Sequence, residues 1–238
     1  MERATYLITP TLYNAYNYYT GTDFAGIYGD AEGAAVAEAK ARQDFLNALN
    51  KVKTPPKLPM LKGLIFEDIV RAMAGGNTDR FGDIVGNHLD KYRAANGEPV
   101  GDKEVIPDEE ELETAREIAE RVKGGLWQQK LTKRVGDYVL FGYADVINRD
   151  TIHDIKRVSQ YSPPKYFDSI QHLLYMVCED LPKFRYEISD GKRVYVETYD
   201  TTAYTLKLLI SRIDSMVAWI RQTPEFEAPF EANWRSKY

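Results

Sequence analysis

Hydrophobic positions in the first half of the chain recur at the spacing of amphipathic helices. The clearest case is the stretch from residue 60 to 74, where Leu61, Leu64, Ile65 and Ile69 share one helical face. An aromatic-rich helix is expected after the Thr9-Pro10 start signal. The helices predicted in this half cover residues 10–19, 30–50, 60–74, 83–95 and 108–120.

The pattern changes after Gly124, where three short β-rich runs follow one another. They cover residues 126–135, 137–148 and 151–158, and short turns separate them, which predicts an antiparallel meander. A helix is expected over residues 162–180, with Pro163 and Pro164 in its first turn. Two further strands, at 183–189 and 192–199, precede a long helix that runs from Thr201 or Thr202 to Ile220.

This order of elements predicts an α/β (α+β) protein with a central mixed β-sheet flanked by helices. We expect a single domain over residues 1–238. Within it, residues 1–123 are mainly helical, residues 124–221 form the sheet core, and residues 222–238 form a peripheral tail.

Composition and charge narrow the function classes. Cys178 is the one cysteine among 238 residues, so the chain can build neither an internal disulfide nor a four-cysteine iron–sulfur cluster. No apolar run is long enough for a bilayer and no secretory signal pattern is visible, so the expectation is a cytoplasmic protein without a membrane partner. The net charge of −5 disfavours a nucleic-acid partner, although a basic cluster follows the acidic helix at residues 121–134.

Candidate chemistry gathers in the second and third strands of the predicted meander. Asp154 and Lys156 are two positions apart on one strand and therefore project from the same face. If the turn at residues 148–150 pairs the two strands, Asp145 falls nearly opposite Asp154. Carboxylates this close repel each other unless a cation lies between them, and oxygen ligands suit Mg²⁺ or Mn²⁺. The backbone carbonyl of Ile155 is a further candidate ligand.

Asp145 followed by Asp154-Ile155-Lys156 in a strand–turn–strand setting resembles the PD-(D/E)XK nuclease superfamily. Gln171 and Tyr175 are similar to the Gln-x-x-x-Tyr element of the branch that holds RecB-type nucleases and phage exonucleases. The resemblance implies a restriction-endonuclease-like αβββαβ core. It also implies that Gln171 and Tyr175 bind the substrate strand or support the metal site. Gly63 and Glu67 fit an upstream Gly-x-x-x-Glu element, which implies Glu67 as another metal ligand.

The resemblance implies a metal-dependent deoxyribonuclease that acts on linear double- or single-stranded DNA. Its catalytic residues would be Asp145, Asp154 and Lys156, with an exonuclease role in recombination, repair or phage DNA processing. A structure- or sequence-specific endonuclease is one alternative, and a catalytically inert nucleic-acid-binding module is another. Homo-oligomerisation and a recombination partner protein stay open, as does the choice of DNA over RNA.

The three histidines and the cysteine are given structural interpretations. His153 alternates to the strand face opposite Asp154, which favours a packing role. His88 and His172 have no visible partner in the sequence, so both are expected at or near the surface. Cys178 lacks the neighbours that a nucleophile needs.

Overall fold

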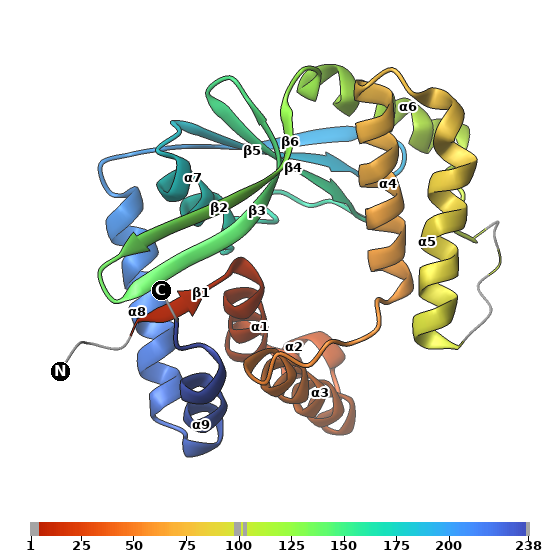
Figure 1. Ribbon diagram of the computed structural model, residues 1–238. Helices are drawn as coiled ribbons and strands as arrows, with labels where there is room; N and C mark the ends of the chain where they lie inside the picture. The colour runs from red at the N-terminus through yellow and green to blue at the C-terminus, as the bar shows by residue number, and fades with distance from the viewer. Residues whose placement is uncertain (1–4, 98–100, 102–103, 237–238) are drawn as a thin grey trace.

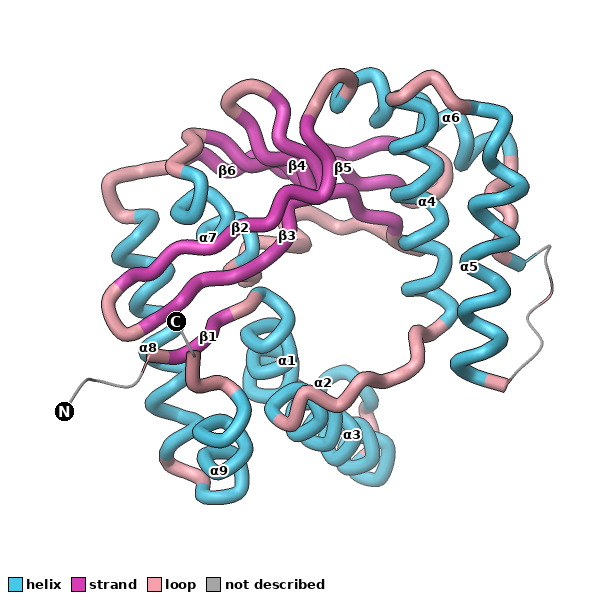
Figure 2. Tube along the Cα trace, in the orientation of Figure 1, coloured by secondary structure: helices cyan, strands magenta, loops and turns pink. Residues whose placement is uncertain are grey.

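A six-stranded mixed sheet with helices on both of its faces forms the centre of the fold (Figures 1 and 2). The structure is a computed structural model that describes residues 5–97, 101 and 104–236. The strands are β1 (Tyr6–Ile8), β2 (Leu126–Val135), β3 (Tyr138–Asn148), β4 (Thr151–Arg157), β5 (Lys183–Ser189) and β6 (Val194–Asp200). The predicted fold class, a mixed sheet flanked by helices, is confirmed.

Helices come before, between and after these strands. They are α1 (Pro10–Gly21), α2 (Phe24–Tyr28), α3 (Ala31–Leu49), α4 (Leu58–Ala74), α5 (Phe81–Asn96), α6 (Glu109–Val122), α7 (Gln171–Glu179), α8 (Thr205–Arg221) and α9 (Pro224–Asn233), with a 3-10 turn at Thr78–Arg80. Side chains cap several of them: Thr9 accepts a hydrogen bond at the start of α1, and Asp108 does so at the start of α6. None of the described helices is both long and apolar enough to cross a membrane.

The sheet follows the order β1-β3-β4-β5-β6, with β2 paired to the other side of β3. β2, β3 and β4 form the predicted antiparallel meander. β4 pairs in parallel with β5, which requires a long crossover connection, and α7 lies in that connection. One strand was not predicted: Tyr6–Ile8 pairs in parallel with the beginning of β3.

Two strands, β1 and β4, pair with different parts of the same edge of β3, and the sheet has a gap between them. Its first residues pair with β1, and its last three, Val146 to Asn148, pair with β4. Pairing with β4 ends at Val146 and His153, beyond which the two strands diverge. The predicted catalytic residues lie at this point of divergence.

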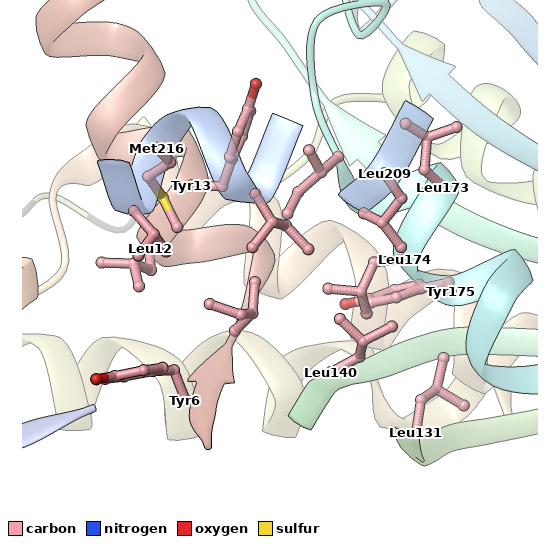
Figure 3. Packing of buried hydrophobic residues seen from close by; sticks show 14 of the residues in the cluster. Tyr6, Leu12, Tyr13, Leu131, Leu140, Leu173, Leu174, Tyr175, Leu209 and Met216 are labelled. Carbon is pink, nitrogen blue, oxygen red and sulfur yellow. The ribbon is translucent and has the colours of Figure 1, made fainter. Parts of the chain in front are cut away.

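Two hydrophobic clusters hold the helices against the sheet. The first joins α1, α3, α7, α8 and α9 to one face, with Leu12, Phe45, Leu174, Leu209 and Phe230 among its buried members. Figure 3 shows part of this cluster, with Tyr175 and Leu174 of α7 beside Leu140 of β3. The second cluster packs α4, α5 and α6 on the other face.

Two predicted elements are wrong. The helix expected over residues 162–180 begins only at Gln171, because the segment before it is held as a loop: the backbone N–H groups of Lys165 and Tyr166 donate to the Glu197 carboxylate. Residues 222–238 are not a peripheral tail over their described part. α9 buries Phe226 and Phe230, and the Trp234 indole donates to the Leu49 carbonyl at 2.9 Å.

Candidate active site

The register of β3 and β4 places Asp145 opposite Asp154, as the short turn predicts. Val146 pairs with His153, so the next position outward in each strand is Asp145 on β3 and Asp154 on β4. These two residues no longer form a ladder pair. Instead, Oδ2 of Asp145 accepts a hydrogen bond from the Ile155 backbone N–H at 2.8 Å. The carboxylate therefore occupies the opening between the diverging strands.

A local irregularity in β2 accompanies this opening. Gln128 has a φ of 52°, and the ladder between β2 and β3 omits the Gln128–Asp145 pair while keeping the pairs on both sides of it. Ala144 packs in the first hydrophobic cluster and Val146 in the second, although the two are two positions apart. Side chains of a regular strand would not switch faces in this way. The backbone thus twists at Asp145.

Asp154 is the most enclosed carboxylate of the group, with 1% of its surface exposed. Its Oδ1 accepts a hydrogen bond from the Gln171 amide at 2.5 Å. Its Oδ2 lies 2.5 Å from the Lys156 ammonium nitrogen. No hydrogen bond from a described residue satisfies Oδ2, so the ion pair with Lys156 is the contact that balances its charge. Three of the residues predicted from sequence are therefore brought into direct contact.

Tyr175 lies one helical turn beyond Gln171 on α7, and its hydroxyl oxygen is 3.4 Å from the Gln171 amide nitrogen. The ring is buried against β3 at Gly142. A Cβ atom at Gly142 would lie 2.4 Å from Cε1 of Tyr175, closer than any real side chain tolerates. Glycine is needed here because α7 must approach β3 closely enough for Gln171 to reach Asp154.

Glu67 reaches the site from α4, on the other side of the sheet. Its Oε1 accepts a hydrogen bond from the Gln128 amide at 2.5 Å. Gln128 was not predicted as a site residue. Nothing in its local sequence distinguishes it from a solvent-facing amide, because its contact depends on a helix that is 61 residues away in the chain.

The electrostatics show that the three carboxylates influence one another. Burial, followed by the charges of Asp154 and Asp68, raises the pKa of Glu67 to about 7. Burial, followed by the charges of Asp154 and Glu67, raises the pKa of Asp145 well above its ordinary value. Burial would lower the pKa of Lys156, but Asp154 and Asp145 more than offset it and raise that pKa. Lys156 is therefore a cation at neutral pH.

The donor atoms fit a hard divalent cation in type and in charge. Carboxylate oxygens are the ligands that Mg²⁺ and Mn²⁺ prefer, and one oxygen of Asp154 has no hydrogen bond. Within the described part of the chain, however, no three acidic, histidine or cysteine side chains form a ready-made cluster for a metal. Each carboxylate has another partner: Glu67 contacts Gln128, Asp145 contacts the Ile155 backbone, and Asp154 contacts Lys156 and Gln171. A metal-binding role for these residues, and for the Ile155 carbonyl, stays a prediction.

The histidines differ from one another in environment. His153 is buried, as a packing role requires, and its Nδ1 lies 3.0 Å from Glu187. The surface position expected for His172 is wrong: it is 4% exposed and stacks on Tyr199 with ring centroids 3.9 Å apart. Burial and the Arg212 charge lower the pKa of His172 to about 4, so it is neutral. His88 is mostly covered and lies 2.7 Å from Asp68.

Comparisons with known proteins give remote structural likenesses. No known protein family and no curated protein sequence matches the chain. One similar solved structure is an exonuclease candidate from Eubacterium rectale, with 13% identity and a TM-score of 0.45 over 97% of this chain and 82% of that one. Another is LHK-Exo in complex with dAMP, with 12% identity and a TM-score of 0.40 over 94% and 90%. These values are too low to assign an activity.

Proposed function

We propose that this protein is a metal-dependent nuclease that hydrolyses DNA phosphodiester bonds. The observation that supports the proposal is the contact of Asp154 with Lys156 and Gln171 where β3 and β4 diverge. Asp145 and Glu67 lie close enough to Asp154 for its charge to raise both of their pKa values. Burying several carboxylates together is costly unless a cation balances them, and here burial and mutual repulsion raise two of their pKa values. Such an arrangement costs stability, which favours a functional role over a structural one.

The chain's own groups divide the chemistry between them. Glu67, Asp145, Asp154 and the Ile155 carbonyl would hold Mg²⁺ or Mn²⁺, and the bound ion would polarise a phosphoryl oxygen and acidify a water. Because Lys156 is protonated, its role is to orient the attacking water and to stabilise negative charge on the phosphorus-bound oxygens. Gln171 fixes the orientation of the Asp154 carboxylate.

A basic groove along α4 supports a polyanionic substrate in spite of the acidic net charge. The groove, about 830 Å³ in volume, lies between α4, α5 and the start of β2, and we call it the α4–α5 groove. Arg71, Arg80 and Lys91 line it, and its one acidic lining residue, Asp68, is engaged with His88. The Arg71 guanidinium lies 5.9 Å from the centre of the Trp127 ring. Cations with an aromatic surface suit phosphates and bases.

Exonuclease action on linear DNA, in recombination, repair or phage DNA processing, is the finer form of the proposal. It rests on the resemblance of Gln171 and Tyr175 to the Gln-x-x-x-Tyr element. The first test incubates purified protein with linear, nicked and circular DNA, with Mg²⁺, Mn²⁺ or EDTA. We expect degradation of linear DNA that needs the metal. Cutting of closed circles would instead identify an endonuclease, and no cleavage of any substrate with either metal would refute the proposal.

Gln171→Leu should lower the DNA cleavage activity in part, to an extent that depends on the Mg²⁺ concentration. The substitution removes the hydrogen bond to Asp154 Oδ1 while keeping a side chain of similar size. Loss of a group that orients a metal ligand typically lowers metal affinity or activity by about 10- to 100-fold. We expect the activity at low Mg²⁺ to fall within that range and to recover in part at high Mg²⁺. Gln43→Leu, which changes an exposed amide on α3, is the matched control. An equal loss at all Mg²⁺ concentrations would contradict the positioning role.

A further inference from the structure

A second basic pocket lies where the β3–β4 turn meets the end of α6 and the beginning of β5. It has a volume of about 360 Å³, and we call it the turn pocket. Five cationic side chains line it against two acidic ones, Glu120 and Asp150. The cationic residues are Arg121, Lys123, Arg149, Lys183 and Arg185. This local excess of positive charge contrasts with the net charge of −5 of the whole chain.

The β4–β5 register explains why the charges gather there. Thr151 pairs with Lys183 and His153 pairs with Arg185, so these four side chains project from the same face of two neighbouring strands. Asp154 projects from the opposite face, toward Gln171. The turn pocket is therefore separate from the group of carboxylates, although it is built on the same strand.

Three of the five cationic groups form no direct ion pair, although Asp150 is near enough for Lys183 and Arg185 to lower its pKa. Arg121 pairs with Glu187, and Lys123 pairs with Glu120. Arg149, Lys183 and Arg185 form no ion pair with any described residue. The Nε atom of Arg185 is also buried without a hydrogen-bond partner, which is a costly state for a charged group.

Buried groups behind the pocket hold its shape. Glu187 is fully buried and contacts both Arg121, at 3.0 Å, and His153, at 3.0 Å. Burial alone would raise the pKa of Glu187, but His153 and Arg121 lower it, so the carboxylate stays ionised. The Glu187 carboxylate contacts Arg121 and His153 and forms no ion pair with the other cations of the pocket. Asp150 is then the one acidic lining residue near Arg149, Lys183 and Arg185, which leaves an excess of positive charge.

We propose that the turn pocket binds a phosphate group, held by Arg149, Lys183 and Arg185. Guanidinium and ammonium groups are the side chains that recognise phosphate oxygens. Building on the proposed nuclease function, the source of this phosphate is the backbone of the substrate DNA, bound away from the bond that is cleaved. Lys123 lines the turn pocket and the next residue, Gly124, lines the α4–α5 groove, so one bound DNA could contact both.

The turn pocket would let the protein contact its DNA substrate at a second place, away from the carboxylates. From Thr151 to Asp154 the strand advances about 10 Å, so a phosphate in the turn pocket belongs to a nucleotide some distance from the cleaved bond. DNA long enough to reach both places would bind more tightly than a fragment that reaches one.

The test measures binding in EDTA, so that it does not depend on catalysis. Anisotropy of a labelled DNA of roughly 20 nucleotides, single- and double-stranded, is recorded against salt concentration for the wild type and for Arg149→Gln/Lys183→Gln. Removing two phosphate contacts should reduce the slope of log affinity against log salt by about 2 and weaken binding roughly tenfold near 0.1 M salt. Arg116→Gln/Lys207→Gln, two exposed cations elsewhere, is the matched control.

A second experiment distinguishes binding of DNA phosphates from binding of free inorganic phosphate. Thermal unfolding with inorganic phosphate should show stabilisation of the wild type that the double variant loses. A response to phosphate without a change in DNA binding would assign the site to free phosphate or a nucleotide. No difference from the wild type in either arm would overturn the proposal. If both arms respond but the wild type cleaves no DNA, the nuclease function fails and the phosphate site stands.

Discussion

Lys156→Met is expected to reduce the rate of DNA hydrolysis by about 10³-fold, because the variant loses the charge that stabilises the transition state. The ammonium of Lys156 forms the ion pair with Asp154, and its raised pKa keeps it charged at neutral pH. Methionine keeps most of the length and apolar surface of the side chain. The buried Asp154 loses its ion-pair partner, so the variant should be less stable without metal, and its Tm is measured beside its activity.

The loss should appear in kcat and leave metal binding in place. Removing a positive charge beside Asp154 weakens the competition with a bound cation, so Mn²⁺ affinity measured by calorimetry should be equal to or higher than that of the wild type. Lys207→Met, an exposed lysine on α8, is the matched control and should retain full activity. Activity of Lys156→Met within about threefold of the wild type would exclude the catalytic role of Lys156.

Asp145→Asn is expected to abolish activity and, in the absence of metal, to stabilise the fold. The asparagine side-chain oxygen can still accept the hydrogen bond from Ile155, while the charge that repels Asp154 and Glu67 is gone. Because the raised pKa shows that the folded protein disfavours the ionised carboxylate, the neutral asparagine should raise the Tm by a few degrees. Unfolding in EDTA at pH 8 measures this difference.

The stability advantage of Asp145→Asn over the wild type should grow as the pH rises. The folded-state pKa values of Asp145 and Glu67 lie above their unfolded values. Between the unfolded and the folded pKa the folded protein therefore holds more protons than the unfolded chain, and its stability falls as the pH rises. For Glu67, stability is therefore lost between about pH 4.5 and pH 7, and the loss stays constant above that. The advantage of Asp145→Asn over the wild type should likewise be larger at pH 8 than at pH 4.

Bound Mg²⁺ should reverse the difference in Tm between the wild type and Asp145→Asn. Mg²⁺ should raise the Tm of the wild type and leave that of Asp145→Asn nearly unchanged, because the variant lacks one of the proposed ligands. Asp44→Asn, which alters an exposed ion pair with Lys40, serves as the control and should behave as the wild type does. A lower Tm for Asp145→Asn than for the wild type in EDTA at pH 8 would show that the buried carboxylate stabilises the fold.

Much of the local geometry followed from the sequence. The two-residue period of strands places Asp154 and Lys156 on one face, and the short turn at Asn148-Arg149-Asp150 leaves one register in which Asp145 comes opposite Asp154. The helical spacing from Leu61 to Ile69 likewise identified α4. These features depend on residues close together in the chain, where dihedral preferences and side-chain periodicity decide the structure.

Contacts between distant segments could not be predicted in this way. Gln128 holds Glu67, His172 is buried on Tyr199, and Trp234 packs at the end of α3, yet no local pattern marks these partners. The sequence determined five of the six strands, the β3–β4 turn and the face on which Asp154 and Lys156 lie. The tertiary structure decided which carboxylates share a buried site and where unpaired cations gather, because burial and charge depend on elements that meet only when the sheet and its helices pack together.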